Sequence, residues 1–297
     1  MRSKTAIVAE GGGQRGIYTA GVLDAFLGNS YNPFDLGVGV SAGAQNLLAY
    51  FLEQSGYARR MIVERTNRPD FLVPYRWLIA RSILDLDGYF EASVQDPDYL
   101  LPYHNITSMA KIRRLQFVAT DSLTLGPVYL EPDAQSACES LKASSAVPFL
   151  YREGVSIDSR VLVDGGVSDP LPVRHAYLNG ARNIVLLRTS PVSDSDEAET
   201  PWRRYVELAR RVLIKPSLMN RMLESHEQAL QSALDFIDTP PDDLRLFVIA
   251  PVAILKSQVF ASQTEYLFED YRQGVSHGQR AVNSLKKWLK EDTAALP

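Results

Sequence analysis

The chain has a single cysteine, Cys138, among its 297 residues. One thiol cannot form a disulfide within the chain, so a small fold held together by disulfides is excluded. The lack of disulfides is compatible with a protein that works in a reducing compartment. Cys138 lies in the stretch SACESLKASS, among helix-forming residues. We expect it to be a small buried side chain rather than a nucleophile.

Long apolar runs are also missing. No stretch approaches the roughly 20 apolar residues that a membrane-spanning helix needs, and the apolar run at 6–9 is too short for a secretory signal. The net charge of −4 gives no overall attraction to nucleic acid. We therefore expect a cytoplasmic protein without a nucleic-acid partner, which reaches the inner face of a membrane only through a local patch. The oligomeric state stays open.

Short β-branched runs alternate with helical patterns along the chain. Amphipathic helices are predicted at about 16–27 and 42–54. Strands are predicted at 5–9, 34–40, 115–120, 128–131, 160–163, 184–188 and 244–249. This alternation predicts βαβ units around a mostly parallel sheet, with the first two strands close together.

The pattern also predicts one α/β domain over residues 1–297. Its catalytic core covers about 1–190, and residues 56–110, which lack clean strands, are expected to form a helical insertion over the sheet. After a loop at 191–201, the part from about 200 to 297 is expected to be mostly helical with one returning strand.

The first strand runs into EGGGQRG, where Gly11, Gly13 and Gly16 satisfy the pattern G-x-G-x-x-G. Between a strand and a helix, this pattern is the dinucleotide fingerprint, because N–H groups at such a turn bind an anion. The fingerprint also needs an acid at the end of the second strand. Asp35 opens that strand instead. A dinucleotide-binding protein therefore remains only a weaker alternative.

The second strand runs into GVSAG, residues 39–43, which places Ser41 between a strand and a helix. This is the context of a nucleophile elbow, in which the serine hydroxyl is presented above the sheet; an ordinary helix cap is the alternative. Parallel strands have their carboxyl ends on one side, so the glycine loop and Ser41 are expected to be neighbours. N–H donors beside an exposed serine form an oxyanion hole.

A serine nucleophile needs a base, and one acidic residue stands out for this role. Asp164 closes a β-branched strand and is followed by Gly165 and Gly166, which leave its carboxylate uncrowded. An Asp-Gly turn without chemistry is the alternative interpretation.

The ordered motifs GGGQRG at 11–16, GVSAG at 39–43 and DGG at 164–166 resemble those of the patatin-like phospholipase family, as does ASSAVPFL at 143–150. The motif similarity covers residues 5–188 and continues more weakly into the LFVIAP strand and the final helix, which resemble those of bacterial patatin-like proteins. The resemblance implies a three-layer α/β/α fold with a mostly parallel central sheet and helical insertions.

The resemblance also implies a Ser–Asp dyad, in which Ser41 is the acylated nucleophile and Asp164 the general base. Arg15 matches a basic residue usual in the family, and we expect it to stiffen the glycine loop. The oxyanion loop would consist of Gly11, Gly12, Gly13 and Gln14, with Arg15 and Gly16 close by. The two other motifs would be supported by Gly39, Gly43, Gly165 and Gly166.

Glu10 departs from the family pattern, because many members have a less acidic residue there. It would place a negative charge beside the anion site and leaves the head-group preference open. None of the four histidines is expected to complete a triad. His175, eleven residues after Asp164, is the most tempting, but it lies in a predicted helix that leads away from Ser41.

These features predict a serine lipid acyl hydrolase of the phospholipase A or lysophospholipase kind, which works through an acyl-enzyme and needs no metal or cofactor. Its substrate would be a lipid or another ester. A non-lipid carboxylesterase or thioesterase with the same dyad is the main alternative, and an inactive scaffold is a weaker one.

Residues 202–223 contain six basic residues and one acid, and Trp202, Val206, Ala209 and Leu213 recur at helical spacing. A basic amphipathic helix with an aromatic end suits a membrane interface. A helix docked on the protein's own core, with its basic face in solvent, is the alternative that we favour.

Overall fold

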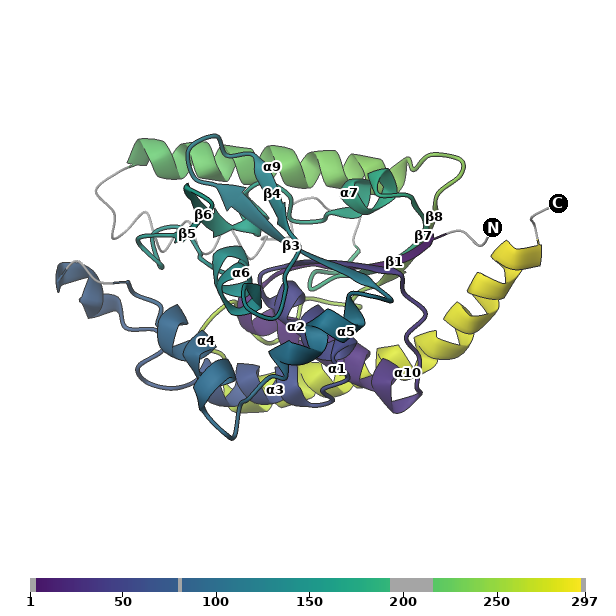
Figure 1. Cartoon of the computed structure of the whole chain (residues 1–297), viewed down its shortest axis with the longest axis horizontal. Helices are drawn as coiled ribbons and strands as arrows, with labels where there is room; N and C mark the ends of the chain where they lie inside the picture. The colour runs from purple at the N-terminus through teal and green to yellow at the C-terminus, as the bar shows by residue number, and fades with distance from the viewer. Residues whose placement is uncertain (1–3, 80–81, 193–215, 295–297) are drawn as a thin grey trace.

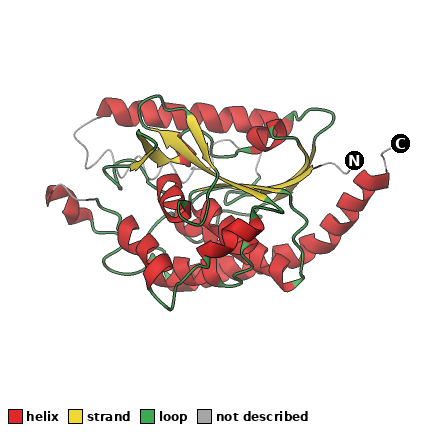
Figure 2. Ribbon diagram, in the orientation of Figure 1, coloured by secondary structure: helices red, strands yellow, loops and turns green. Residues whose placement is uncertain are grey.

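The computed structural model of the chain describes residues 4–79, 82–192 and 216–294. A central sheet lies between two layers of helices (Figures 1 and 2). One face is covered by α7 (Val173–Leu178) and α9 (Pro216–Asp238). The other is covered by α1 (Gly16–Gly28), α2 (Ala42–Phe51) and α10 (Thr264–Ala294). The predicted three-layer α/β/α arrangement is confirmed.

The described residues form an eight-stranded sheet in the order β5-β6-β3-β2-β1-β7-β8, with β4 pairing β3 outside this path. The strands are β1 (Lys4–Ala9), β2 (Leu36–Val40), β3 (Arg114–Asp121), β4 (Pro127–Leu130), β5 (Val155–Ile157), β6 (Arg160–Asp164), β7 (Ala181–Leu187) and β8 (Arg245–Ile249). The five strands from β3 to β8 on this path are parallel, whereas β4, β5 and β6 pair antiparallel. The mostly parallel sheet is therefore as predicted.

The strand that the sequence analysis missed is β5. It pairs with β6 through a two-residue turn at Asp158 and Ser159, whose φ values are 48° and 63°. Positive φ at both positions is typical of the turns that close two-residue hairpins. Three residues are too few for alternation of polar and apolar side chains to be recognised.

Side chains of β1 alternate between the two faces of the sheet. Ile7 and Ala9 pack with the core of α1 and α2, whereas Ala6 and Val8 pack with α7 and with Ala233 of α9. Because helices cover both faces, the strand is apolar from Ala6 to Ala9, which is typical of a buried parallel sheet.

Residues 56–110 are built of short helices. They form α3 (Tyr57–Arg60), a π-helical turn (Met61–Arg65), a 3-10 helix (Pro74–Ile79), α4 (Leu86–Gln95), a 3-10 turn (Tyr103–Asn105) and α5 (Ile106–Met109). The remaining helical elements are α6 (Ala137–Ser144) and two 3-10 turns, Gly13–Arg15 and Gly165–Val167. The description of the chain as one domain with an insertion stays a prediction.

Helices α1 and α10 touch backbone to backbone. A Cβ atom added at Gly274 would lie 2.0 Å from the main-chain oxygen of Tyr18, and one at Gly278 would lie 2.7 Å from that of Val22. Glycine is required where two backbones approach so closely. The Tyr18 hydroxyl also lies 2.6 Å from Nδ1 of His277. The last helix is thus held against the first.

Cys138 lies in α6 and is partly buried, where full burial was expected. Its Sγ lies 3.7 Å from the main-chain oxygen of Phe90, and burial raises the pKa of the thiol. A raised pKa leaves less thiolate, so the expectation that Cys138 is not a nucleophile has a physical basis.

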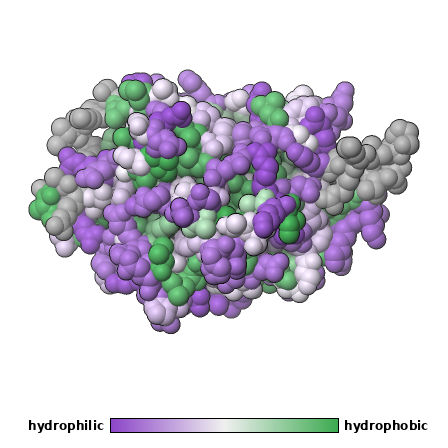
Figure 3. All heavy atoms as spheres, in the orientation of Figure 1, coloured by the Kyte–Doolittle hydropathy of each residue, from purple (hydrophilic) through white to green (hydrophobic). Residues whose placement is uncertain are grey.

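Most of the predicted amphipathic segment, residues 202–215, lies outside the described residues. From Pro216 onward it belongs to α9, where Met219 and Met222 are buried and Met222 packs with residues of β6 and the following turn. The described part of the segment therefore docks on the protein. Across the described residues, no helix is both long and apolar enough to cross a membrane. Figure 3 shows a mainly hydrophilic face with scattered hydrophobic patches.

Candidate active site

Ser41 and Asp164 meet because two strands end against each other along one edge of β3. The last residue of β2, Val40, pairs with Val118, and the last residue of β6, Asp164, pairs with Ala119. Strand β4 occupies the opposite edge of β3. Since β2 runs parallel to β3 and β6 runs antiparallel, their carboxyl ends face each other, and Ser41 follows directly on β2.

Ser41 adopts the strained backbone of a nucleophile elbow. Its φ is 52° and its ψ is −124°, immediately before α2. Non-glycine residues with positive φ are uncommon and cluster at functional sites. The turn is held by Ser144, whose Oγ accepts a 2.9 Å hydrogen bond from Ser41 N and donates a 2.6 Å bond to the carbonyl of Val118.

The motif glycines around Ser41 permit close backbone contacts. A Cβ at Gly39 would lie 2.5 Å from Cα of Ala44, and a Cβ at Gly43 would lie 2.5 Å from the main-chain oxygen of Ala9. These contacts let α2 begin directly against the end of β1, where the glycine loop starts.

The glycine loop lies beside Ser41, as predicted from the parallel strands. A Cβ at Gly11 would lie 3.2 Å from that of Ser41, and Gly12 and Gly13 have φ values of 142° and 57°. Gly16 begins α1 against α2. Among the described residues, the N–H groups of Gly11, Gly12 and Gly13 have no hydrogen-bond acceptor, which leaves three donors for an anion.

Gln14 anchors the glycine loop through both its main chain and its side chain. The N–H of Gln14 donates to the carbonyl of Val259 at 2.9 Å, so this N–H is not available to an anion although Gln14 belongs to the loop. Its side chain donates to Thr66 and to Asn67 and accepts from the N–H of Ser262, each at 2.7 Å. These contacts tie the loop to two other segments of the chain.

Thr189 is a residue that the sequence analysis missed. Its Oγ1 donates to the carbonyl of Gly11 at 2.7 Å, and its own carbonyl accepts a 2.6 Å bond from Nη2 of Arg15. Arg15 is buried and therefore braces the loop, which agrees with the expected stiffening role. The position of Thr189 just after β7, which pairs with β1, could have indicated that it lies near the glycine loop.

The charge of Glu10 is balanced inside the protein. Its Oε2 accepts a 2.7 Å hydrogen bond from the N–H of Thr189 and lies 3.6 Å from Nε of Arg188. The negative charge expected beside the anion site is therefore present but faces a cation at close range, which reduces its effect on a developing oxyanion.

Asp164 is buried and in contact with Ser41. Its Oδ1 accepts a 2.8 Å bond from the N–H of Gly166, while a Cβ at Gly165 would lie 2.2 Å from the carbonyl oxygen of Val118. Burial raises the pKa of Asp164 to about 6, against the lowering effect of hydrogen bonds from Gly166 and from the Ser41 hydroxyl. A pKa nearer neutrality makes the carboxylate a stronger base than an exposed aspartate.

The histidine nearest to this pair is His226 of α9, which the sequence analysis did not single out. Its Nδ1 lies 2.5 Å from the carbonyl of Gly166, so the proton must be on Nδ1, because a carbonyl only accepts. Burial lowers the pKa of His226. Nothing in the sequence indicates that His226 lies near Asp164, because α9 begins more than fifty residues after Asp164.

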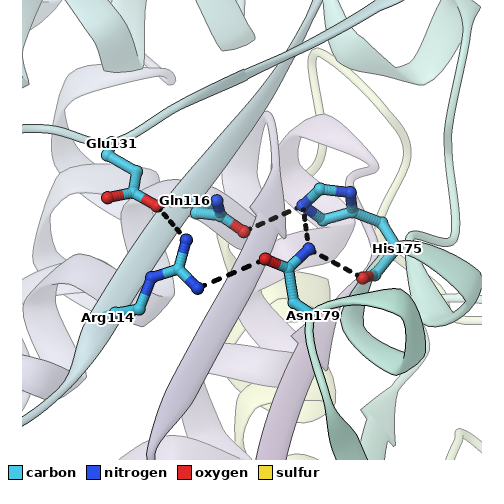
Figure 4. A network of polar contacts seen from close by, with 5 residues as sticks. All are labelled: Arg114, Gln116, Glu131, His175 and Asn179. Atoms are coloured by element: carbon cyan, nitrogen blue, oxygen red, sulfur yellow. Dashed lines mark hydrogen bonds and ion pairs between the residues drawn. The ribbon is translucent and has the colours of Figure 1, made fainter.

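His175 belongs to a separate network at the amino end of the parallel strands (Figure 4). Its Nε2 lies 2.9 Å from Oε1 of Gln116 and 3.1 Å from Nδ2 of Asn179, and its ring stacks on Tyr129. Arg114 of the same network is paired with the first residue of β2, whereas Ser41 follows the last one. His175 therefore lies away from the serine, as expected.

A cavity of about 640 Å³ opens over Ser41 and Asp164. Its apolar lining comes partly from the segments before β3, with Ile62, Phe71, Leu84, Leu86, Tyr89 and Phe90, and from Val147. It comes also from the later part of the chain, with Leu230, Leu234 and Ile237 of α9 and with Val248, Ile254, Val259 and Phe260. The cavity thus joins polar groups at the strand ends to surfaces suited to hydrocarbon. Within the described residues, no cluster of three metal-ligating side chains occurs.

Comparisons with known proteins agree with this arrangement. Residues 7–177 match the family model described as patatin-like phospholipase, and residues 217–290 match a model for a domain of unknown function, DUF6363. The chain is 37% identical over 294 residues to the uncharacterized protein YjjU of Escherichia coli K12. The match covers 97% of this chain and 80% of YjjU.

Two solved structures are similar at low identity. VipD from Legionella pneumophila has 14% identity and a TM-score of 0.46, over 96% of this chain and 67% of VipD. Human group IVD cytosolic phospholipase A2, in complex with methyl gamma-linolenyl fluorophosphonate, has 13% identity and a TM-score of 0.49, over 98% of this chain and 60% of the human chain. Because the family match covers more than half of the sequence, the chain belongs to the patatin-like phospholipase family.

Proposed function

We propose that the protein is a serine lipid acyl hydrolase that uses Ser41 and Asp164 as a catalytic dyad. The observation that carries the proposal is the placement of Ser41 and the buried Asp164 at the facing ends of β2 and β6, in the wall of one cavity. Burial raises the pKa of Asp164 to about 6. A base with this pKa is largely ionised at neutral pH and still accepts a proton readily.

The reaction follows from these positions. Asp164 takes the proton of the Ser41 hydroxyl as the serine oxygen attacks the ester carbonyl. The N–H groups of Gly11, Gly12 and Gly13 stabilise the negative oxygen of the tetrahedral intermediate. When the carbon–oxygen bond of the leaving alcohol breaks, Asp164 returns the proton to that alkoxide. Water, deprotonated by Asp164, then attacks the acyl carbonyl, the bond from that carbon to the Ser41 oxygen breaks, and Asp164 returns the proton to the serine oxygen as the fatty acid leaves.

The cavity favours a lipid over a small polar ester, because many apolar side chains line it beside the serine. A carboxylesterase or thioesterase with the same dyad remains the alternative. The dinucleotide interpretation has lost its support, because Asp35 lies at the amino end of β2, where its Oδ2 accepts a 2.9 Å bond from Thr5 N.

A fluorophosphonate probe tests the proposal together with a panel of phospholipids, lysophospholipids, acylglycerols, thioesters and soluble esters. The probe should label Ser41, and Ser41→Ala should remain folded and lose both labelling and hydrolysis. Persistent hydrolysis by the folded Ser41→Ala protein would refute the dyad. Preference for short soluble esters over every lipid would favour the alternative.

We also propose that the segment 202–223, whose described part docks on the protein, makes a peripheral membrane contact through the basic and aromatic residues that precede Pro216. Binding to vesicles that contain anionic lipid should weaken with salt and should weaken further when Arg210 and Arg211 are replaced by glutamate. Equal binding by the two proteins would refute this contact.

A further inference from the structure

The cavity over Ser41 holds a cation that the proposed mechanism does not use. Arg188 follows the last residue of β7, and its side chain is 12% exposed in the cavity wall. Its Nε lies 3.6 Å from Oε2 of Glu10, which is an ion-pair distance but not a hydrogen bond. Across the described part of the chain, the guanidinium makes no hydrogen bond.

Nε of Arg188 is buried without a hydrogen-bond acceptor, which is unfavourable. Glu10 does not supply the missing acceptor, because its Oε2, which accepts from Thr189 N at 2.7 Å, lies 3.6 Å from Nε, too far for a hydrogen bond. Among the described residues, the donors of Arg188 are therefore left for a ligand. The forked guanidinium matches two oxygens of a phosphate or carboxylate.

The sheet places Arg188 at a useful distance from the serine. Ala9 of β1 pairs with Leu187 on one side and with Gly39 on the other. Arg188 and Ser41 therefore both lie at the carboxyl ends of the parallel strands, directly after β7 and β2, which are separated by β1. Two strand spacings correspond to roughly 10 Å. An extended arginine side chain and the glycerol backbone of a lipid together bridge that span.

The charges around Arg188 limit how much negative charge its bound anion can carry. Glu10, Glu227 and Asp238 also line the cavity, so it is not basic as a whole. A single negative charge held against Arg188 is tolerated better there than a double one, because like charges repel more strongly at low dielectric. This favours a phosphodiester over a phosphomonoester.

We propose that Arg188 binds the phosphodiester of a glycerophospholipid whose acyl ester lies over Ser41. The inference rests on the proposed hydrolase function and adds to it the residue that recognises the phosphate of the head group.

The test compares two substrates that differ only in the head group, lysophosphatidylcholine and the monoacylglycerol with the same acyl chain. Charge-assisted hydrogen bonds of this kind correspond to an effect on the order of 10- to 100-fold. Arg188→Gln should lower kcat/KM for lysophosphatidylcholine by about that factor, mainly through KM, and by at least about tenfold more than for the monoacylglycerol. Arg188→Lys should restore part of the loss.

Arg182→Gln is the matched control, because Arg182 belongs to the same strand but is paired on the surface with Asp243 at 2.7 Å. It should leave the ratio of the two substrates unchanged. A direct readout is calorimetric binding of glycerophosphocholine, which has the phosphodiester but no ester. The unsubstituted protein should bind it, and Arg188→Gln should not.

Equal losses on both substrates would mean that Arg188 only maintains the fold around Glu10, and would overturn the inference. Unchanged kinetics for Arg188→Gln would overturn it as well. If the unsubstituted protein hydrolyses no ester and Ser41 takes no probe, the proposed function fails instead. Glycerophosphocholine binding would then still decide the role of Arg188.

Discussion

The main-chain nitrogen of Ser41 lies 2.9 Å from the hydroxyl oxygen of Ser144, which in turn donates to Val118 at 2.6 Å. One hydroxyl group thus joins the nucleophile turn to the strand along which β2 and β6 meet. The position of the serine oxygen depends on this connection as much as on the glycines of its own motif.

Ser144→Ala should therefore reduce both stability and turnover. A buried N–H that loses its acceptor costs about 1–3 kcal/mol, and the strained turn loses its brace. We expect a lower Tm in thermal unfolding and a lower kcat, with KM little changed. Ser140→Ala, also buried on α6, is the control. A normal kcat for Ser144→Ala would mean that the turn holds its own shape.

The rate of hydrolysis should follow the ionisation of Asp164. Its burial raises the pKa to about 6, and only the carboxylate accepts the serine proton. We expect kcat/KM for a soluble neutral ester to rise with pH through about 6 and then to level off. A rate that stays constant from about pH 4 to pH 8 would show that Asp164 is not the base.

The same pKa gives Asp164 a cost in stability at neutral pH. An acid with a raised pKa in the folded state contributes stability below its unfolded pKa, and that stability is lost as pH rises through the folded pKa. Asp164→Asn should therefore be inactive, and at pH 8 more stable than the unsubstituted protein, by on the order of 1–3 kcal/mol. The difference should vanish near pH 4. Lower stability of the variant at both pH values would refute this account.

His226 should affect catalysis without being part of the dyad. Its Nδ1–H bond to Gly166 fixes the turn whose N–H contacts Asp164. We expect His226→Ala to lower kcat by about tenfold, well short of the 10⁴-fold losses typical of a triad residue, and His226→Gln to recover part of it through its amide donor. His175→Ala is the control, and its kcat should stay near that of the unsubstituted protein. Equal kcat values for the two alanine variants would contradict the role of His226.

Much of the site could be predicted because its residues follow directly on strands. Ser41 and the glycine loop come after parallel strands that neighbour each other, so their proximity follows from topology alone. Asp164 is harder to place, because its strand is antiparallel and its pairing with β3 depends on a hairpin that includes β5. That hairpin has no clear periodic signal in the sequence.

The site residues that the sequence analysis missed are distant in sequence from the motifs that they contact. Thr189 and Arg188 reach the site at the end of β7 and His226 reaches it through α9. Their place after a strand is the one signal for the first two, and nothing in the local sequence marks His226. Gln14 was predicted as part of the oxyanion loop, and the motif does not reveal that its N–H donates to the carbonyl of Val259. Motifs predict which backbone turns form, whereas the partners of each polar group depend on tertiary packing.

The backbone contact between α1 and α10 has a consequence for synthesis. The helix α1, which precedes β2, buries its face against residues 264–294, which follow it in the chain by more than 200 residues. Until those residues have left the ribosome, the surface around Tyr18 and Val22 has no covering partner. The nascent chain should therefore hold Ser41 and the glycine loop already translated but not yet assembled until residues 264–294 have emerged.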